Sequence, residues 1–328
     1  MLCGTRRLAC FALVASQGDS NVTPLDMSNP LAPVAHPPVG GASGAHGIAV
    51  SPNGLFALTA NNSANTVTPY DLKNPLVPVS HSGVAILQSA PQGIAISPNG
   101  LFALVAASAV VPLDLSNPLV PVAHTGVAVG SGAYGIAISP SGTFALVVNS
   151  GSSSVTPLDL SNPLAPVAQA AVTVGSSPIG IAISPSGLFA LVTNSGSNSV
   201  TPLDLANPLA PVAHGAITVG STPYGVAISP TGLFALVSNY AAATVTALDL
   251  TTPLTPVAHA AVAAGSHPFG ISISPISNAP LFAIVANLTG ATITPLDLST
   301  PLAPVAQATV GVGSSPYSLG PTMIYFQR

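Results

Sequence analysis

The chain has 328 residues and a formal net charge of −4, and 4% of its residues are charged, against about 25% in an ordinary soluble domain. Its four basic residues cannot form a patch that neutralises phosphates, which excludes nucleic-acid binding and electrostatic attraction to an anionic membrane. The longest apolar stretch, 101–115, is interrupted by Ser108, Pro112 and Asp114 and is shorter than the roughly 20 apolar residues of a membrane span.

The N-terminal segment, 1–10, differs from the rest of the chain. It holds both cysteines, so no disulfide framework is predicted. Arg6 and Arg7 precede the apolar run 8–15, an arrangement typical of a short signal peptide. The same run contains 11–14, however, which begins the first copy of an internal repeat. We therefore expect an atypical first segment of the fold and no clear signal peptide.

One short unit recurs seven times along the chain. Each copy has a Phe-Ala-Leu-like segment followed by a Thr-Pro-Leu-Asp-Leu-like segment. The first of these segments begins at Phe11, Phe56, Phe102, Phe144, Phe189, Phe234 and Phe282. In most copies a Gly-Ile-Ala-Ile-Ser-like segment comes before it, and these segments recur about every 45 residues. That period is typical of a four-stranded propeller blade.

The copy at 180–223 shows the strands of one unit in chain order. Strands are predicted at 180–184, 188–193, 199–205 and 212–219, separated by turns rich in Ser, Pro, Asn and Gly. In most copies a proline lies inside the third strand, where its missing N–H interrupts pairing. These prolines are Pro24, Pro69, Pro112, Pro157, Pro202 and Pro295. We expect a bulge at each of them, or a fourth strand that pairs only beyond it.

Apolar residues occupy both faces of the predicted strands, as in 189–192. A sheet with one solvent-exposed face would show alternating apolar and polar residues along each strand. Both faces of each blade must therefore be covered by the neighbouring blades. The ends of the chain are complementary, because the first copy begins at its second strand and 318–328 follows the last complete copy. We predict one all-β domain, 1–328, a seven-bladed propeller of four-stranded antiparallel blades closed by pairing of its N- and C-terminal segments. The closing strand is 318–321 or 322–327, or 1–3 supplies a stub of it.

Two phrases of the repeat resemble known families. The segments 191–200 (Leu-Val-Thr-Asn-Ser-Gly-Ser-Asn-Ser-Val) and 219–230 are similar to the YVTN β-propeller repeat, and 158–167 is similar to the LVIVD repeat. The resemblance covers about 11–317 and implies a propeller fold. It also implies a surface or secreted location, and related seven-bladed folds include lactonases and redox enzymes. The Ser-Pro-Asp-Gly turn usual in such repeats lacks its acid here, which weakens any inference of cation binding.

Two sets of polar residues repeat around the predicted ring. The aspartates at the end of the third strand are Asp26, Asp71, Asp114, Asp159, Asp204, Asp249 and Asp297. A carboxylate there accepts backbone N–H bonds, so we interpret these residues as turn-forming. A second position holds His36, His81, His124, His214 and His259, with Gln169 and Gln307 in the other copies. Equivalent positions on different blades do not converge on one metal ion, and exchange with Gln favours hydrogen bonding.

The loops that lead into the inner strands supply the candidate binding residues, because propellers usually open to the central channel there. We expect a ligand-binding site at the channel mouth formed by His46, Gln92, Tyr134, Tyr224, His267 and Tyr317. His46 and His267 belong to the two blades that flank the first, so both can border one patch. A general-base or metal pair is the functional interpretation, and ordinary surface histidines are the alternative.

The missing residue types guide the functional prediction. Without Glu, with one Lys and with aspartates used in turns, the sequence offers no complete catalytic set, no cofactor motif and no metal cluster. We therefore expect a non-catalytic scaffold or binding protein, without a cofactor, that contacts protein or carbohydrate through its loop faces. The alternative is a lactonase-like hydrolase with its site at the channel mouth. A metal- or redox-linked propeller is a third possibility.

Three glycosylation sequons begin at Asn21, Asn61 and Asn287. All three fall in or near the predicted loop between the second and third strands. We therefore expect their side chains to be accessible to solvent.

Overall fold

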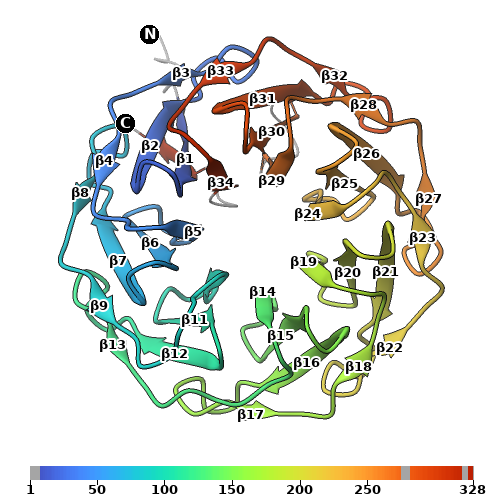
Figure 1. Cartoon of the computed structure of the whole chain (residues 1–328), viewed down its shortest axis with the longest axis horizontal. Helices are drawn as coiled ribbons and strands as arrows, with labels where there is room; N and C mark the ends of the chain where they lie inside the picture. Colours follow the sequence, from blue (N-terminus) through green and yellow to red (C-terminus); the bar gives the residue numbers. More distant parts are fainter. Residues whose placement is uncertain (1–7, 275–280, 320–323, 328) are drawn as a thin grey trace, which may run out of the picture.

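The computed structural model describes residues 8–274, 281–319 and 324–327. These residues form seven antiparallel β-sheets arranged as a closed ring around a central channel (Figure 1). Each sheet is one blade, so the predicted all-β, seven-bladed propeller is confirmed. Its strands are the whole of the regular structure in the described part of the chain. No helix there has the length and apolar character needed to cross a bilayer.

Each blade has an inner, a second and a third strand. The inner strands are β34 (Pro316–Leu319), β5 (Ala45–Val50), β10 (Ile94–Ile96), β14 (Ala133–Ile138), β19 (Pro178–Ile183), β24 (Pro223–Ile228) and β29 (Pro268–Ile273). The second strands are β1 (Leu8–Ser16), β6 (Phe56–Asn61), β11 (Phe102–Ala106), β15 (Phe144–Asn149), β20 (Phe189–Asn194), β25 (Phe234–Asn239) and β30 (Phe282–Asn287). The third strands are β2 (Asn21–Asp26), β7 (Thr66–Asp71), β12 (Val110–Asp114), β16 (Ser154–Asp159), β21 (Ser199–Asp204), β26 (Thr244–Asp249) and β31 (Thr292–Asp297).

The outer strand is split into two short pieces in most blades. The pieces are β3 (Val34–Ala35) with β4 (Val39–Gly40), β8 (Val79–Ser80) with β9 (Val84–Ala85), β13 (Val122–Ala123), β17 (Val167–Ala168) with β18 (Val172–Thr173), β22 (Val212–Ala213) with β23 (Ile217–Thr218), β27 (Val257–Ala258) with β28 (Val262–Ala263), and β32 (Val305–Ala306) with β33 (Val310–Gly311). Both pieces pair with the same third strand, one at each end of it. The third blade has only β13, plus an isolated bridge between Val110 and Val127.

The split lies beside the middle of the third strand, where six blades have a proline and the blade of β26 has Ala247. In the blade of β20 and β21, the register runs without a break through Leu191 and Pro202, so the predicted bulge is absent. The carbonyl of Pro202 accepts a hydrogen bond from the backbone N–H of His214 at 2.9 Å. Because N–H and C=O of one residue point to the same side of an antiparallel strand, the missing N–H of Pro202 also faces the outer strand. The outer strand pairs on both sides of the proline and is interrupted beside it.

The core lies between the blades. Every residue of β15 is buried, and successive side chains point to opposite neighbours. Phe144 and Leu146 pack with Val192 of the next blade, whereas Ala145 packs with Leu104 of the preceding one. Each fully buried Leu or Phe contributes about 1.5–3 kcal/mol through removal from water. Coverage of both sheet faces is therefore confirmed, and it accounts for the scarcity of charged residues.

The ring closes through the two ends of the chain. β34 pairs with β1 at Ser318 and Ala15, and β35 (Ile324–Gln327) pairs with the other half of β1. Both of the C-terminal segments considered from sequence therefore contact the same strand, whereas 1–3 lies outside the described residues. Asp19, the acid that belongs to no repeat position, accepts hydrogen bonds from the backbone N–H and the hydroxyl of Ser314. The predicted closure by paired terminal segments is confirmed.

The expectation about the sequons is wrong. Asn61 and Asn287 are fully buried, because each ends its second strand instead of opening the loop. The amide of Asn61 donates to the hydroxyls of Thr66 and Thr68 at 3.0 and 2.8 Å. This asparagine ties the second strand to the third, which leaves no room for a glycan on the folded protein.

Candidate functional site

A left-handed turn directs the chain into each inner strand. The residue two positions after it reaches the channel mouth. The turn residues, with φ between 47° and 68°, are Gly44, Ala90, Gly132, Ser177, Thr222, His267 and Ser315. Most L residues avoid this region of φ. Its recurrence in every blade shows that the turn is part of the repeat.

The residues that follow these turns meet at one end of the channel. They are His46, Gln92, Tyr134, Ile179, Tyr224, Phe269 and Tyr317, one from each blade. Together with the glycines after them they line a cavity of about 130 Å³, which we call the aromatic mouth. Five of the six candidates predicted from sequence lie in this lining. Ile179 and Phe269 complete it, and they stand at the same repeat position.

A ring of glycines sits directly below the aromatic mouth. A Cβ atom on Gly47 would lie 2.5 Å from the carbonyl oxygen of Gln92, and one on Gly93 would lie 2.5 Å from that of Tyr134. Gly93 donates its N–H to the Tyr134 carbonyl at 3.1 Å. Neighbouring inner strands therefore touch through their backbones where the glycines stand, and Ser318 takes this position in the remaining blade. We call these glycines the glycine waist.

Hydroxyl groups of the second strands fix the backbone of the aromatic mouth. Thr193 donates to the carbonyl of Tyr224 at 2.6 Å and accepts from the N–H of Gly180 at 2.8 Å. Ser238 bonds in the same way to the carbonyl of Phe269, at 2.5 Å. The bonds to the carbonyls of Tyr224 and Phe269 cross from one blade to the next, so the positions of these aromatic residues depend on the preceding blade.

The rings of the aromatic mouth form a continuous row. The ring centroid of His46 lies 3.7 Å from that of Tyr317, which lies 4.0 Å from Phe269. Phe269 stacks on Tyr224 at 4.4 Å. Contacts of this length between rings add about 0.5–1.5 kcal/mol each beyond the area they bury. The row holds the His46 ring in one orientation.

The electrostatics of the aromatic mouth favour uncharged side chains. His46 is 8% exposed, and burial lowers the pKa of its imidazole from 6.5 to about 4. Burial raises the pKa of Tyr317 to about 12, and burial together with the nearby Tyr317 raises the pKa of Tyr134. The two hydroxyls are 2.5 Å apart. The Oε1 atom of Gln92 is buried without a hydrogen-bond partner.

His267 is the predicted candidate that does not line the aromatic mouth. It occupies a left-handed turn position, and its Nδ1 lies 2.6 Å from the hydroxyl of Thr289. Its ring contacts Tyr240 at 4.5 Å, and Tyr240 in turn contacts Tyr224 at 4.9 Å. His46 and His267 therefore lie at opposite ends of the row of rings. Sequence reasoning missed Tyr240, which follows the second-strand asparagine, where no other copy has an aromatic residue.

The repeated polar residues lie away from this site. Each repeat aspartate accepts a hydrogen bond from the backbone N–H two residues later, which confirms their role in turns; the Ser161 N–H, for example, donates to Asp159 at 2.8 Å. The repeat histidines directly follow the first outer piece in separate blades. Lys73 is the one lysine, and it pairs with Asp71 at 3.1 Å on an exposed turn. Within the described residues no three His, Cys, Asp or Glu side chains gather as metal ligands would.

Comparison with known proteins shows the fold. No family model and no curated protein sequence matches the chain. Among solved structures, a candidate 6-phosphogluconolactonase from Bacteroides uniformis superposes with a TM-score of 0.85 at 15% identity, covering 95% of this chain and 98% of the other. One from Bacteroides fragilis gives 0.83 at 15% identity, covering 97% and 99%. A periplasmic gluconolactonase from Pseudomonas aeruginosa gives 0.81 at 17% identity, covering 95% and 98%.

These neighbours correct the functional prediction. A non-catalytic scaffold was expected because no complete set of catalytic acids was visible in the sequence. Structures named as lactonases, with nearly complete coverage in both directions, favour the alternative of a lactonase-like hydrolase instead. At 15–17% identity the likeness shows the fold alone, and the chemistry of the site depends on the residues of this chain.

Proposed function

We propose that the chain hydrolyses an uncharged sugar lactone at the aromatic mouth. The observation that carries this proposal is a neutral, buried His46 held against Tyr317, whose hydroxyl is paired with that of Tyr134. A base and a pair of hydroxyl donors thus line the same cavity, and ester hydrolysis requires both kinds of group. The lactonase names of the structural neighbours support the same reaction class.

The proposed reaction needs only water as a co-reactant. A water oxygen attacks the lactone carbonyl carbon while the neutral imidazole of His46 takes its proton. In the tyrosine pair one hydroxyl donates to the other, which leaves the proton of the second free to bind the developing oxyanion. The ring C–O bond then breaks, the leaving oxygen takes the proton from His46, and the product is a hydroxy acid.

The charge and size of the mouth define the substrate class. Its described lining has no cationic side chain, and a phosphate is normally bound by Arg or Lys. An unphosphorylated sugar lactone is therefore favoured over a phosphorylated one. The cavity of about 130 Å³ is smaller than the ~300–1,000 Å³ of sites that enclose a whole ligand. It holds the reacting carbonyl and the water, while the sugar ring lies against the aromatic row.

The test compares lactone substrates and two matched variants. Purified protein is expected to accelerate hydrolysis of glucono-1,5-lactone, measured by proton release at constant pH, and to act more slowly on its 6-phosphate. His46→Gln, which introduces the residue found at the equivalent position 92, should lower kcat by about 10²–10⁴-fold. His267→Gln, outside the cavity, should leave kcat unchanged. No acceleration over the buffer rate, or equal activity of both variants, would refute the proposal.

The pH dependence gives a second readout. Because His46 acts as a base only when neutral, kcat/KM should be constant above about pH 5 and fall roughly tenfold per pH unit below about pH 4. An acid limb centred near pH 6.5 would place the catalytic base elsewhere.

Two finer points rest on sequence resemblance. The likeness of 191–200 and 219–230 to YVTN repeats supports a surface or secreted location, which cell fractionation tests directly. The continuous repeat supports treating 1–328 as one domain, with one cooperative unfolding transition expected by calorimetry.

A further inference from the structure

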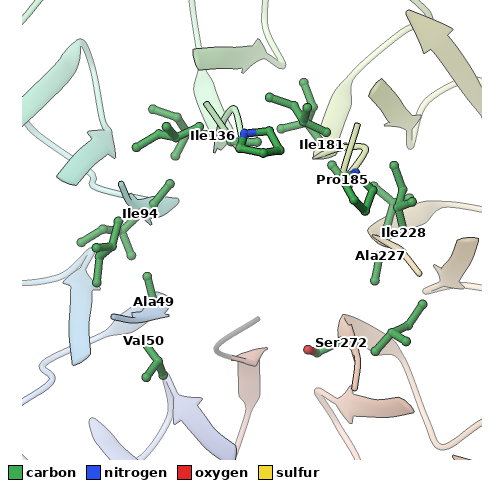
Figure 2. Close-up of a pocket in the computed structure, with 18 of the residues that line it drawn as sticks. Ala49, Val50, Ile94, Ile136, Ile181, Pro185, Ala227, Ile228 and Ser272 are labelled. Carbon is green, nitrogen blue, oxygen red and sulfur yellow. The ribbon is translucent and has the colours of Figure 1, made fainter. Parts of the chain in front are cut away.

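The channel on the other side of the glycine waist is wide and apolar. Its described lining comes from six inner strands and the turns after them, and it encloses about 480 Å³ (Figure 2). Its lining includes Ile94, Ile136, Ile181 and Ile228. This volume lies within the range of about 300–1,000 Å³ found for small-molecule sites.

The channel wall carries a single polar side chain within its described lining, Ser272. The equivalent residues in five other blades are Ala49, Ala95, Ala137, Ala182 and Ala227. Ser272 is 1% exposed, and its hydroxyl is buried without a hydrogen-bond partner. In Figure 2 the oxygen of Ser272 points toward the open centre of the channel. A buried hydroxyl without a partner is unfavourable, so a ligand oxygen that reaches it binds more tightly.

The turns around the channel opening expose leucines next to polar residues such as Asn53 and Ser186. The turns that follow the inner strands expose Leu55, Leu101, Leu188 and Leu233, each between 48% and 63%. Pro52, Pro140 and Pro185 of the same turns line the channel itself. An apolar molecule leaving water therefore meets apolar side chains before it enters.

We propose that this channel binds a linear aliphatic molecule that carries one uncharged oxygen, of the class of medium-chain alcohols. The aliphatic chain packs against the isoleucines, and the oxygen shares a hydrogen bond with Ser272. The described lining has no cation to neutralise a carboxylate, and burying an unpaired charge is costly, so fatty-acid anions are excluded. The site is separate from the proposed lactonase mouth, because the glycine waist lies between them.

The experiment measures binding of 1-octanol to the full chain by isothermal titration calorimetry. The wild-type protein should bind one equivalent, with sodium octanoate bound at least tenfold more weakly. Ser272→Ala should weaken 1-octanol binding about five- to tenfold, the usual effect of losing one hydrogen bond. It should leave the binding of n-hexane unchanged. This variant is expected to fold, because alanine occupies the same position in five other blades.

A second variant locates the ligand. Ala182→Phe fills the channel and should abolish 1-octanol binding, whereas Val212→Phe, on the exposed outer strand of the same blade, should not. Circular dichroism verifies that both fold, and Ala227→Phe replaces the first variant if it does not. Binding that survives in the folded channel variant, or octanoate that binds as tightly as octanol, overturns the proposal. Sedimentation gives a further outcome that overturns the proposal. If octanol does no more than dissociate a dimer, the apolar face is a surface for self-association.

Discussion

The two ends of the channel are built from the same inner strands but differ in how far the repeat has diverged. At the position directly before the glycine waist, the seven blades have His, Gln, Tyr, Ile, Tyr, Phe and Tyr. Two residues after it, six blades supply Ala or Ser. One end has become chemically distinct in each blade, whereas the other has stayed close to the repeat. Divergence of a single register position is enough to place a varied polar and aromatic cluster on a uniform ring.

The largest expected effect concerns the protonation of His46. The folded protein holds this imidazole neutral down to about pH 4, whereas the unfolded chain binds the proton below about pH 6.5. Stability is therefore fully present above pH 6.5 and falls as the pH drops toward 4, by about 3 kcal/mol from this residue. Urea unfolding at pH 7 and pH 4 measures the difference. His46→Gln should remove it, while His259→Gln on the outer edge should not; equal curves for all three proteins would contradict the assignment.

The next effect tests the boundary between the two ends. Gly93→Ala places a Cβ atom 2.5 Å from the carbonyl of Tyr134, so the blades must separate, at a cost of about 1–3 kcal/mol. Gly215→Ala is the matched control, because nothing lies within 4 Å of a Cβ there. Chemical unfolding compares the two variants. If both lose the same stability, the backbone contact at the glycine waist is not tight.

A smaller effect isolates the tyrosine pair of the aromatic mouth. Tyr134→Phe removes the partner of the Tyr317 hydroxyl and should cost about 1 kcal/mol. Tyr240→Phe serves as the control, since its ring contacts persist without the hydroxyl. The free energy of unfolding is measured for both, and a neutral Tyr134→Phe would show that the pair contributes nothing.

The smallest expected effect concerns ring closure on the aromatic side. Hydrogen bonds from Ser314 lower the pKa of the exposed Asp19 carboxyl, so this link is present above its ordinary pKa of 3.8 and is lost on further acidification. Asp19→Asn should lower the melting temperature by less than Tyr134→Phe does. Combining it with Ser314→Ala should add no further loss, because both substitutions break one link. Additive losses in calorimetry would mean that the two residues act separately.

Much of the fold follows from features that repeat. The period, the number of blades and the coverage of both sheet faces are visible in sequence because each copy repeats the same apolar pattern. The turn role of Asp159 and its equivalents is equally local, since the carboxylate bonds a backbone group two residues away. Five candidates of the aromatic mouth were found because their positions are fixed by the repeat.

The features that sequence did not reveal depend on side-chain direction and on contacts between blades. His267 is one position away from a proline that opens an inner strand, yet its left-handed backbone turns the ring toward Thr289. Asn61 was assigned to a loop because Asn and Ser follow it, but its side chain bonds inward to Thr68. Tyr240 joins the row of rings from the loop after β25, in the same blade as Tyr224. The contacts of His267 and Tyr240 belong to single copies, so the periodic pattern carries no sign of them. The Asn61 contact recurs at Asn149, Asn194, Asn239 and Asn287, so the repeated Asn and Ser or Thr positions could have indicated it.

The interrupted outer strands have a consequence for self-association. A long exposed strand edge can pair with another molecule and start aggregation, and proteins often block such edges with charged side chains. This chain has few charges, and its outer strands expose valines such as Val167 at 56% and Val212 at 58%. Each outer piece is two residues long, in the blade with Ala247 as well as in the blades with a third-strand proline. The interruption of the outer strands therefore keeps these exposed edges short, which limits their pairing with another molecule without the need for charged side chains.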